Sequence, residues 1–416
     1  DGTWVAKLID LLDSVEKEVK NDVDVYNEQI EAAGKLRNFR LAEKLRLTLQ
    51  TIEGRELLGF LASKNVLPKY GFPVDTVELR TLHAADPTGR NLDLGRDLSL
   101  AIYEYAPGNQ VVAGGKVWTS AGLRKVPGRE LVQLSYRVCD TCMRFESGHM
   151  LDDAPACPTC STAFKPTRRL VRPEFGFVAE RETRDVGTAP PQRVTHGDSY
   201  VEDAGEEIGS YTWTSGAGIK VTARAGTRAR VAVLSDGTGG GFMVCEWCGW
   251  ARPPERGSRR KKHERPEDGR ECGGRLENLS LGHQYQTDVA EFTFDGINLR
   301  NDETSTWRSA LYALLEGASE SLEISRDDID GTLAWSRNLR RSIVLYDTVP
   351  GGAGAARRIA ENIGPVINMA ASRLDGCDCG LETTCYGCLR NYRNARYHED
   401  LSRRAALHLL GGDGAR

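Results

Sequence analysis

Eleven cysteines and one histidine fall into three groups of four whose spacing is that of zinc ligands. A structural zinc ion prefers four tetrahedral sulfur or nitrogen donors, and a Cys-x2-Cys turn presents two thiolates together. Eleven thiols cannot complete three such sites, and His263 is the histidine that lies inside an incomplete group. The sequence therefore predicts three structural Zn²⁺ ions. Their predicted ligands are Cys139, Cys142, Cys157 and Cys160 in the first group; Cys245, Cys248, His263 and Cys272 in the second; and Cys377, Cys379, Cys385 and Cys388 in the third.

Three other interpretations of these residues stay open at the level of the sequence. The odd number of cysteines argues against a disulfide framework, because one thiol would be left unpaired. The first residues show no secretory signal segment and nothing else indicates an oxidising compartment, so we expect a cytoplasmic protein. Four clustered thiolates also suit an iron–sulfur cluster, which is the alternative for the third group. His263 could instead be a solvated residue of a basic loop.

Catalytic chemistry has little support in the sequence. There is no Gly-x4-Gly-Lys-Ser/Thr motif for ATP. The glycine-rich segment 350–356 could hold a phosphate at the start of the following helix, but close packing of that helix on its strand explains the glycines better. Asp347, at the end of the same strand, has no second catalytic group at a defined spacing. A zinc site with four protein ligands leaves no position for a water molecule. We therefore predict no catalytic centre in this chain.

The charge distribution points to local rather than global contacts with anions. The net charge of −4 excludes binding to a polyanion through the bulk field. Residues 251–270 nevertheless contain eight arginines and lysines, so this loop of the second zinc group could contact phosphates. No run of eighteen apolar residues predicts a membrane helix. The candidate nucleic-acid contacts are Arg259, Arg260, Lys261, Lys262, Arg390, Arg393 and Arg396.

The apolar patterns indicate a mixed α+β fold with N-terminal helices, a β-rich middle with zinc ribbon-like modules, and a C-terminal α/β domain with a four-cysteine zinc knuckle. Helical spacing covers residues 1–65, with a second helix over 39–64, and residues 304–322, where Thr304 is a candidate N-cap. The other expected elements are strands within 99–106, 109–120, 129–138, 229–235 and 281–296, a mobile loop or linker over 186–217, a strand–turn–helix unit over 342–363, and short helices over 385–396 and 402–410.

These elements predict four consecutive regions, as expected for a chain of 416 residues. The predicted regions are a helical segment at 1–66, a β-rich domain with the first zinc site at 67–185, a linker and β region with the second zinc site and the basic loop at 186–300, and an α/β zinc-binding domain at 301–416.

Several segments together resemble the C-terminal half of large bacterial DEAD/DEAH-box helicases of the MrfA type, which end in an MrfA-like zinc-binding domain. The tail of the DrmB protein of the DISARM phage-defence system is similar. The resemblance covers most of residues 55–410 and is most specific in the last 70 residues. It implies zinc binding by the third cysteine group and supports His263 in the second. The segments that carry it are 60–75 (FLASKNVLPKYGFPVD), 101–123, 281–289 (LGHQYQTDV), 346–358 (YDTVPGGAGAARR) and 377–407.

Both helicase motor lobes are missing from this sequence, so the resemblance implies either a C-terminal piece of a longer helicase or a partner of a motor in another chain. The first functional hypothesis is a zinc-binding accessory region of a superfamily 2 DNA helicase that binds or guides nucleic acid in DNA repair or phage defence, with ATP hydrolysis elsewhere. The second is a zinc-stabilised scaffold that docks a helicase partner without touching nucleic acid. A nuclease centred on Asp347 is a third, weaker hypothesis.

Overall fold

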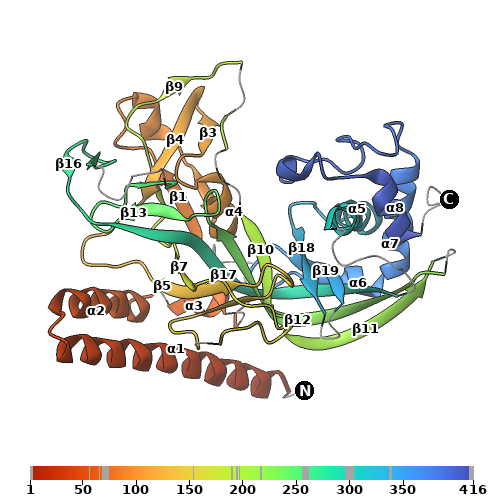
Figure 1. Cartoon of the computed structure of the whole chain (residues 1–416), viewed down its shortest axis with the longest axis horizontal. Coiled ribbons are helices and arrows are strands. Elements are labelled where there is room, and N and C mark those ends of the chain that lie inside the picture. Colours follow the sequence, from red (N-terminus) through yellow and green to blue (C-terminus); the bar gives the residue numbers. More distant parts are fainter. Residues whose placement is uncertain are drawn as a thin grey trace.

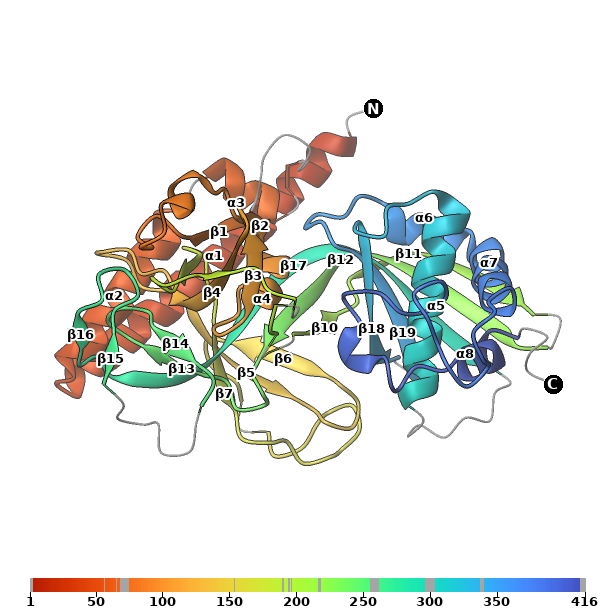
Figure 2. The same ribbon diagram turned by 90° about the horizontal axis from the view of Figure 1, so that it is seen from above.

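The protein is built from two halves that share two very long strands, and the predicted mixed α+β class is confirmed. The computed structural model describes residues 3–411 except 56, 65, 68–74, 153, 189, 190, 194, 196, 216, 217, 255–261, 296–303 and 337–339. Figures 1 and 2 show β12 (Lys220–Ser235) and β17 (Leu276–Asp295) running from one half to the other. The helices are α1 (Thr3–Lys35), α2 (Phe39–Glu53), α3 (Leu57–Ser63), α4 (Leu98–Glu104), α5 (Thr304–Leu322), α6 (Ala355–Glu361), α7 (Ile363–Asp375) and α8 (Arg403–Leu410), with 3-10 turns at Pro87–Asn91 and Ala395–Tyr397.

Within the described residues the strands form sheets of six, eleven and two strands. The six-stranded sheet contains β2 (Gly95–Asp97), β1 (Thr76–Arg80), β8 (Phe177–Ala179), β4 (Lys116–Leu123) and β3 (Gln110–Ala113), with β9 (Arg184–Asp185) beside β4. The eleven-stranded sheet follows the order β10 (Asp198–Asp203), β12, β17, β7 (Arg168–Val171), β5 (Gln133–Val138) and β6 (Phe145–Gly148), and also holds β11 (Glu206–Thr214), β13 (Phe242–Cys245), β14 (Ala251–Arg252), β18 (Ile329–Trp335) and β19 (Arg341–Asp347). The two-stranded sheet pairs β15 (His263–Glu264) with β16 (Glu271–Cys272).

The two long strands contribute to two separate hydrophobic cores. One end of the pair, with Val221 and Phe292, packs under α5, α6, α7 and α8 in the C-terminal half. The other end, with Val231 and Leu281, packs with α4 and the six-stranded sheet. A bulge in β12 between Gly226 and Ala229 lies where the strand passes from one core to the other. The pair therefore positions both halves of the molecule on one continuous support.

Several predicted elements are confirmed. Helix α5 covers Thr304–Leu322 as expected, although Thr304 is its first residue rather than a preceding cap. The strand–turn–helix unit over 342–363 is β19 followed by α6. No helix of the described residues combines the length and the apolarity needed to cross a membrane.

Four predictions about elements were wrong. The apolar run 99–106 begins as helix α4, because Asp97 accepts a hydrogen bond from Ser99 N at 2.9 Å and caps it. The helix expected over 39–64 ends at Glu53 and is followed by α3, with Gly54 at the break. Short apolar runs fit both a helix and a strand, so sequence alone could not decide the first case.

The expected linker at 186–217 contains β10 and β11 instead. Strand β11 has a solvent face, and its Gly, Ser and Thr residues gave it the composition of a loop. The short helix expected over 385–396 is a series of turns with one 3-10 turn at Ala395–Tyr397, because zinc-ligand spacing rather than helical packing shapes this segment.

Candidate metal centres

The structure brings the twelve predicted ligands together in three groups of four. In each group the ligand atoms lie within 4.8 Å of one another. A tetrahedral zinc ion with bonds of about 2.3 Å to sulfur needs ligand sulfurs roughly 3.8 Å apart. Sulfur–sulfur distances within each group agree with this spacing: 3.5 Å between Cys142 Sγ and Cys157 Sγ, 3.8 Å between Cys245 Sγ and Cys272 Sγ, and 3.7 Å between Cys379 Sγ and Cys388 Sγ. The donor sets and their spacing are those of three structural zinc ions.

The Cys-x2-Cys turns of the first two groups share one backbone hydrogen bond and one left-handed residue. The residue after the second cysteine donates its N–H to the carbonyl of the first, as Met143 does to Cys139 at 2.9 Å and Ser161 to Cys157 at 2.8 Å. Met143 and Ser161 have positive φ angles of 58° and 60°, and Gly249 repeats the pattern in the second group with 75°. The left-handed residue turns the chain so that both sulfurs point to the same side.

The first centre lies at the end of the β5–β6 hairpin. Strand β5 ends at Val138, so Cys139 follows it directly. The second pair of ligands belongs to a separate turn closed by a bridge between Ala156 and Ala163. Phe164 and Trp335 pack against this small cluster, and Trp335 comes from β18 in the C-terminal half. The first centre therefore also connects the two halves.

The second centre uses both a turn and a hairpin. The turn follows β13, which ends at Cys245. In the β15–β16 hairpin, His263 stands directly opposite Cys272. The Nε2 atom of His263 lies 3.3 Å from Cys248 Sγ, and the ring stacks on Trp250 at 4.8 Å between centroids. The imidazole is 7% exposed, so the hypothesis of a solvated histidine does not fit.

The turn of the second centre rests directly on strand β4. Leu123 N donates to Gly249 O at 2.8 Å, and Gly122 forms a bridge with Trp250. A Cβ atom at Gly249 would lie 1.9 Å from Leu123 O. Only glycine therefore permits this contact between zinc centre and sheet.

Gly249→Ala is expected to lower the free energy of unfolding by roughly 2–4 kcal/mol, since it combines a steric clash with a left-handed backbone. Gly273→Ala is the matched control, because Gly273 neighbours the same centre but its Cβ would meet nothing within 4 Å. Urea denaturation of both variants checks the prediction, and equal midpoints for the two would contradict it.

The third centre is integrated into the C-terminal core. Cys388 is 1% exposed and belongs to the large cluster formed by α5, α6, α7 and α8. Burial raises the pKa of the Cys388 thiol to about 12, so its sulfur stays protonated unless a cation binds it. Arg403, the first residue of α8, donates to the carbonyl oxygens of Cys377 and Cys379 and lies 3.6 Å from the Cys379 sulfur. Four thiolates on one Zn²⁺ leave excess negative charge, which this buried guanidinium offsets.

Sequence reasoning did not identify Arg403 as part of the third centre. The residue stands fifteen positions after Cys388, and nothing in the spacing of a basic residue predicts contact with ligand carbonyls. Its position at the start of a helix gave the only hint, since cationic side chains are unfavourable there unless another partner compensates.

Asp347 has a structural position rather than a catalytic one. Its side chain is fully buried, and its two carboxylate oxygens accept hydrogen bonds from the backbone N–H groups of Ala353, Ala355 and Ala356 at 2.5, 3.1 and 2.6 Å. Ala355 and Ala356 begin α6, and Ala353 lies in the glycine-rich turn just before it. The carboxylate therefore occupies the place at the helix N-terminus where a phosphate would bind.

The candidate nucleic-acid contacts lie in two places. Arg259, Arg260 and Lys261 fall outside the described residues. Lys262 is exposed and lies 2.6 Å from Glu271.

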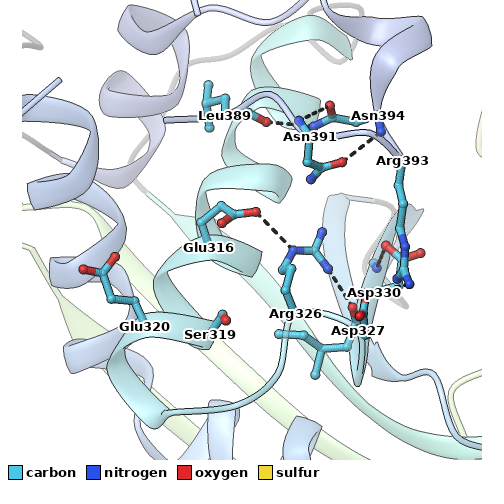
Figure 3. A network of polar contacts seen from close by, with 12 residues as sticks. Glu316, Ser319, Glu320, Arg326, Asp327, Asp330, Leu389, Asn391, Arg393 and Asn394 are labelled. Atoms are coloured by element: carbon cyan, nitrogen blue, oxygen red, sulfur yellow. Dashed lines mark hydrogen bonds and ion pairs between the residues drawn. The ribbon is translucent and has the colours of Figure 1, made fainter. Parts of the chain in front are cut away.

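The other three arginines follow the third centre, and each has partners inside the protein. Arg393 pairs with Asp327 at 2.8 Å beside the Asn391–Asn394 turn shown in Figure 3. Arg390 Nε donates to Thr384 Oγ1 at 2.9 Å. Arg396 pairs with Asp198 of β10. Their contact with phosphates stays a prediction.

Comparison with known proteins bears on the half that contains the third centre. Residues 310–389 match the family model of the MrfA Zn-binding domain. The matched range runs from α5 to the turn that carries Cys385 and Cys388, so all four ligands of the third centre lie in the MrfA Zn-binding domain. Residues 310–389 are thus similar to the MrfA Zn-binding domain.

The other similarities are more distant. The chain is 25% identical over 400 residues to Druantia protein DruE of Escherichia coli, an alignment that covers 85% of this chain and 22% of DruE. Crystal structures of the DUF1998 helicase MrfA bound to DNA and without a named ligand give TM-scores of 0.35 and 0.36 at 12% and 11% identity. They cover 82% and 76% of this chain, and 34% and 32% of MrfA. The chain thus spans about a fifth of DruE and about a third of MrfA.

Proposed function

We propose that this chain is a zinc-stabilised accessory region of a superfamily 2 DNA helicase, which binds nucleic acid while a motor elsewhere hydrolyses ATP. The match of residues 310–389 to the MrfA Zn-binding domain carries the proposal. The setting that the resemblance implies is DNA repair or phage defence in the cytoplasm. The three ligand groups support an accessory role, because each supplies four protein donors and leaves no open position on a metal.

In this proposal the zinc ions hold the chain in shape, and the basic segment 251–270 contacts the nucleic acid. When bound, each zinc ion supplies a tetrahedral cross-link between segments that have few apolar side chains of their own. In the second centre, this cross-link closes the two ends of the basic segment 251–270 at Cys248 and Cys272. A loop held at both ends can present its cations to phosphates with less loss of conformational entropy than a free tail. The three backbone N–H donors at the start of α6 play no part in this, since the carboxylate of Asp347 accepts their hydrogen bonds.

Binding to DNA should weaken steeply as salt concentration rises. If about four phosphates are contacted, affinity for duplex DNA falls by roughly a hundredfold between 50 and 200 mM salt. Fluorescence anisotropy with labelled single-stranded and duplex oligonucleotides measures this. The variant Arg259→Glu, Arg260→Glu, Lys261→Glu, Lys262→Glu should weaken binding to both probes and reduce the salt slope.

A matched control reverses four exposed lysines of α1, with the variant Lys7→Glu, Lys17→Glu, Lys20→Glu, Lys35→Glu. The total charge change is the same, so a long-range field effect would appear in both variants and a local contact only in the first. Binding that is absent from the wild type, or insensitive to salt, would rule out the nucleic-acid role.

The second candidate function is a scaffold for the helicase motor, in cis or in trans. The observation that favours it is the exposed apolar face on the first turns of α1, where Trp4, Ile9 and Leu12 are 67%, 51% and 39% exposed. Beside it, a groove of about 540 Å³ between α1 and α3 is lined by Val15, Phe60 and other apolar side chains. The basic-loop variant distinguishes the two functions, because unchanged DNA binding together with co-purification of the motor would favour the scaffold.

A further inference from the structure

Strand β11 leaves one of its two edges without a neighbouring strand in the part of the chain that the structure describes. Its inner edge pairs with β12 from Glu206 to Thr214, and the sheet continues on the far side of β12 through β17. No backbone hydrogen bond joins the outer edge of β11 to another described residue. Figure 1 shows this strand at the outer margin of the C-terminal half. The outer edge is therefore available to one more strand.

The hydrogen-bonding groups of this outer edge belong to alternate residues. Ser215 N donates to Ile219 O at 2.9 Å, so these two residues form one of the hydrogen-bonded pairs that join β11 to β12. In an antiparallel ladder every second pair is bonded in this way, and the residue between two such pairs turns its N–H and C=O to the opposite edge. Ser210, Thr212 and Thr214 therefore direct their backbone groups away from β12.

The stretch Gly209–Thr214 has the composition of a strand that pairs readily. It carries no charge and no proline, and most of its residues are aromatic or threonine. Charges and bulges are the usual devices that keep an edge strand from pairing. In β11 they are confined to the other end, where Glu206 and Glu207 stand and where the register shifts between Glu207 and Gly209. The rest of the edge is left without such protection.

The distribution of charge along β11 suits a second copy of the same strand in antiparallel orientation. Parallel pairing would bring Glu206 and Glu207 of both copies together, whereas antiparallel pairing places them at opposite ends of the contact. Alignment on Thr212 uses every outward-directed residue of the neutral stretch, because Thr212 then faces its counterpart and Ser210 faces Thr214. The side chains of these residues are exposed, and hydroxyl pairs of this kind are favourable across neighbouring strands.

The surroundings of the edge also suit a second copy better than a foreign peptide. Peptides that add to a sheet edge gain specificity from pockets that take alternate side chains. Beside β11 the solvent face instead presents further strand residues, such as Thr222 of β12 directly opposite Thr212. On the other face α7 packs on β11, where Trp213 lies against Gly364. The residues that α7 exposes in its first turns are uncharged, namely Pro365, Asn368 and Ser372. Two copies can therefore approach here without burying an unpaired charge.

We propose that two copies of this chain associate through the outer edges of β11, antiparallel and centred on Thr212, to form one continuous sheet. The two-fold axis passes beside Thr212, and the pairing uses both edges, so association stops at the dimer. The paired stretch Gly209–Thr214 is short, which places the interface at the small end of the known range. We expect a dissociation constant of roughly 1–100 µM. The dimer does not depend on the proposed contact with nucleic acid.

Thr212→Lys is expected to weaken self-association of the full chain by roughly tenfold or more, because two lysines would face each other at the axis. Thr222→Lys is the matched control, since it adds the same charge to the same face one strand further in. In that variant the two added charges lie about three strand spacings apart, roughly 14 Å, and salt screens them. Its dissociation constant should stay within about threefold of the wild-type value. Sedimentation velocity across the micromolar range measures all three proteins.

Amide hydrogen exchange locates the contact. Exchange within residues 209–214 should slow as the concentration of the wild type rises, because the outward N–H groups become bonded in the dimer. The same segment of Thr212→Lys should show little change. A wild type that stays monomeric across the micromolar range overturns the proposal, even where a helicase motor protects the same amides. A dimer that forms equally well in Thr212→Lys and Thr222→Lys also overturns it, since another surface must then hold the two copies together.

Discussion

Cys388→Ser will remove one zinc ion and destabilise the C-terminal core more than any other single ligand replacement in the first or third centre. Cys388 is 1% exposed and packs in the cluster that joins α5, α7 and α8. Metal binding and folding are coupled in structural zinc sites, with apparent binding free energies of about 10–16 kcal/mol in isolated fingers. Loss of even a third of that, about 4 kcal/mol, should lower the unfolding midpoint by roughly 10 °C.

Cys142→Ser in the first centre is the comparison that isolates the role of the core. Cys142 is also buried, at 2% exposed, but its cluster contains few residues besides the ligands themselves. Both variants should hold two zinc ions instead of three by metal analysis. The shift in thermal midpoint should be distinctly larger for Cys388→Ser. Three zinc ions in Cys388→Ser, or equal midpoints for the two variants, would refute this account of the third centre.

The metal centres could be predicted from the sequence because covalent spacing limits where ligands can point. A Cys-x2-Cys turn brings two sulfurs together whatever the surrounding fold. His263 needed more than spacing, since its position depends on the register of β15 with β16, which sets it opposite Cys272. The count of eleven thiols indicated that a histidine had to complete the set, and the family resemblance supported His263.

The elements that could not be predicted depend on contacts between distant segments. The run 99–106 has strand-like composition, and it becomes α4 because a capped first turn places Ala101 and Ile102 in the core beneath β12 and β17. Strand β11 has loop-like composition, and its pairing along β12 from Glu206 to Thr214 makes it a strand. The paired strand supplies hydrogen bonds that no local propensity reveals.

The role of Asp347 likewise depends on contacts that the sequence does not reveal. In sequence, a carboxylate at the end of a buried strand beside a glycine-rich turn fits either a catalytic or a structural role, and the lack of a second catalytic group favours the structural one. The structure distinguishes them, because three backbone donors of the turn and of α6 point at the two oxygens. This arrangement explains the glycines of the turn. Gly351, Gly352 and Gly354 adopt positive φ angles, which allow the backbone to fold around the carboxylate.

Asp347→Ala is therefore expected to lower the free energy of unfolding by roughly 3–6 kcal/mol. Three buried N–H groups lose their acceptor, each at a cost of about 1–3 kcal/mol, and relaxation of the surrounding backbone recovers part of the total. Ser402→Ala is the matched control, because Ser402 caps α8 through one hydrogen bond of 3.3 Å to Ala405 N and should cost only about 1 kcal/mol. Denaturant unfolding gives both values. A loss for Asp347→Ala no larger than that for Ser402→Ala would show that water replaces the carboxylate at little cost.

Asp347→Asn separates the charge of this residue from its hydrogen bonds. Burial raises the folded-state pKa of Asp347, and this outweighs the opposing effect of the three backbone donors. A carboxyl group whose folded pKa lies above the unfolded value contributes stability that is complete below the unfolded pKa and is lost as pH rises through the folded pKa. Asparagine does not titrate, so the stability of the wild type relative to Asp347→Asn should be greatest at low pH and should decline across that window. A difference that grows with rising pH would mean that the three N–H groups stabilise the anion more than burial opposes it.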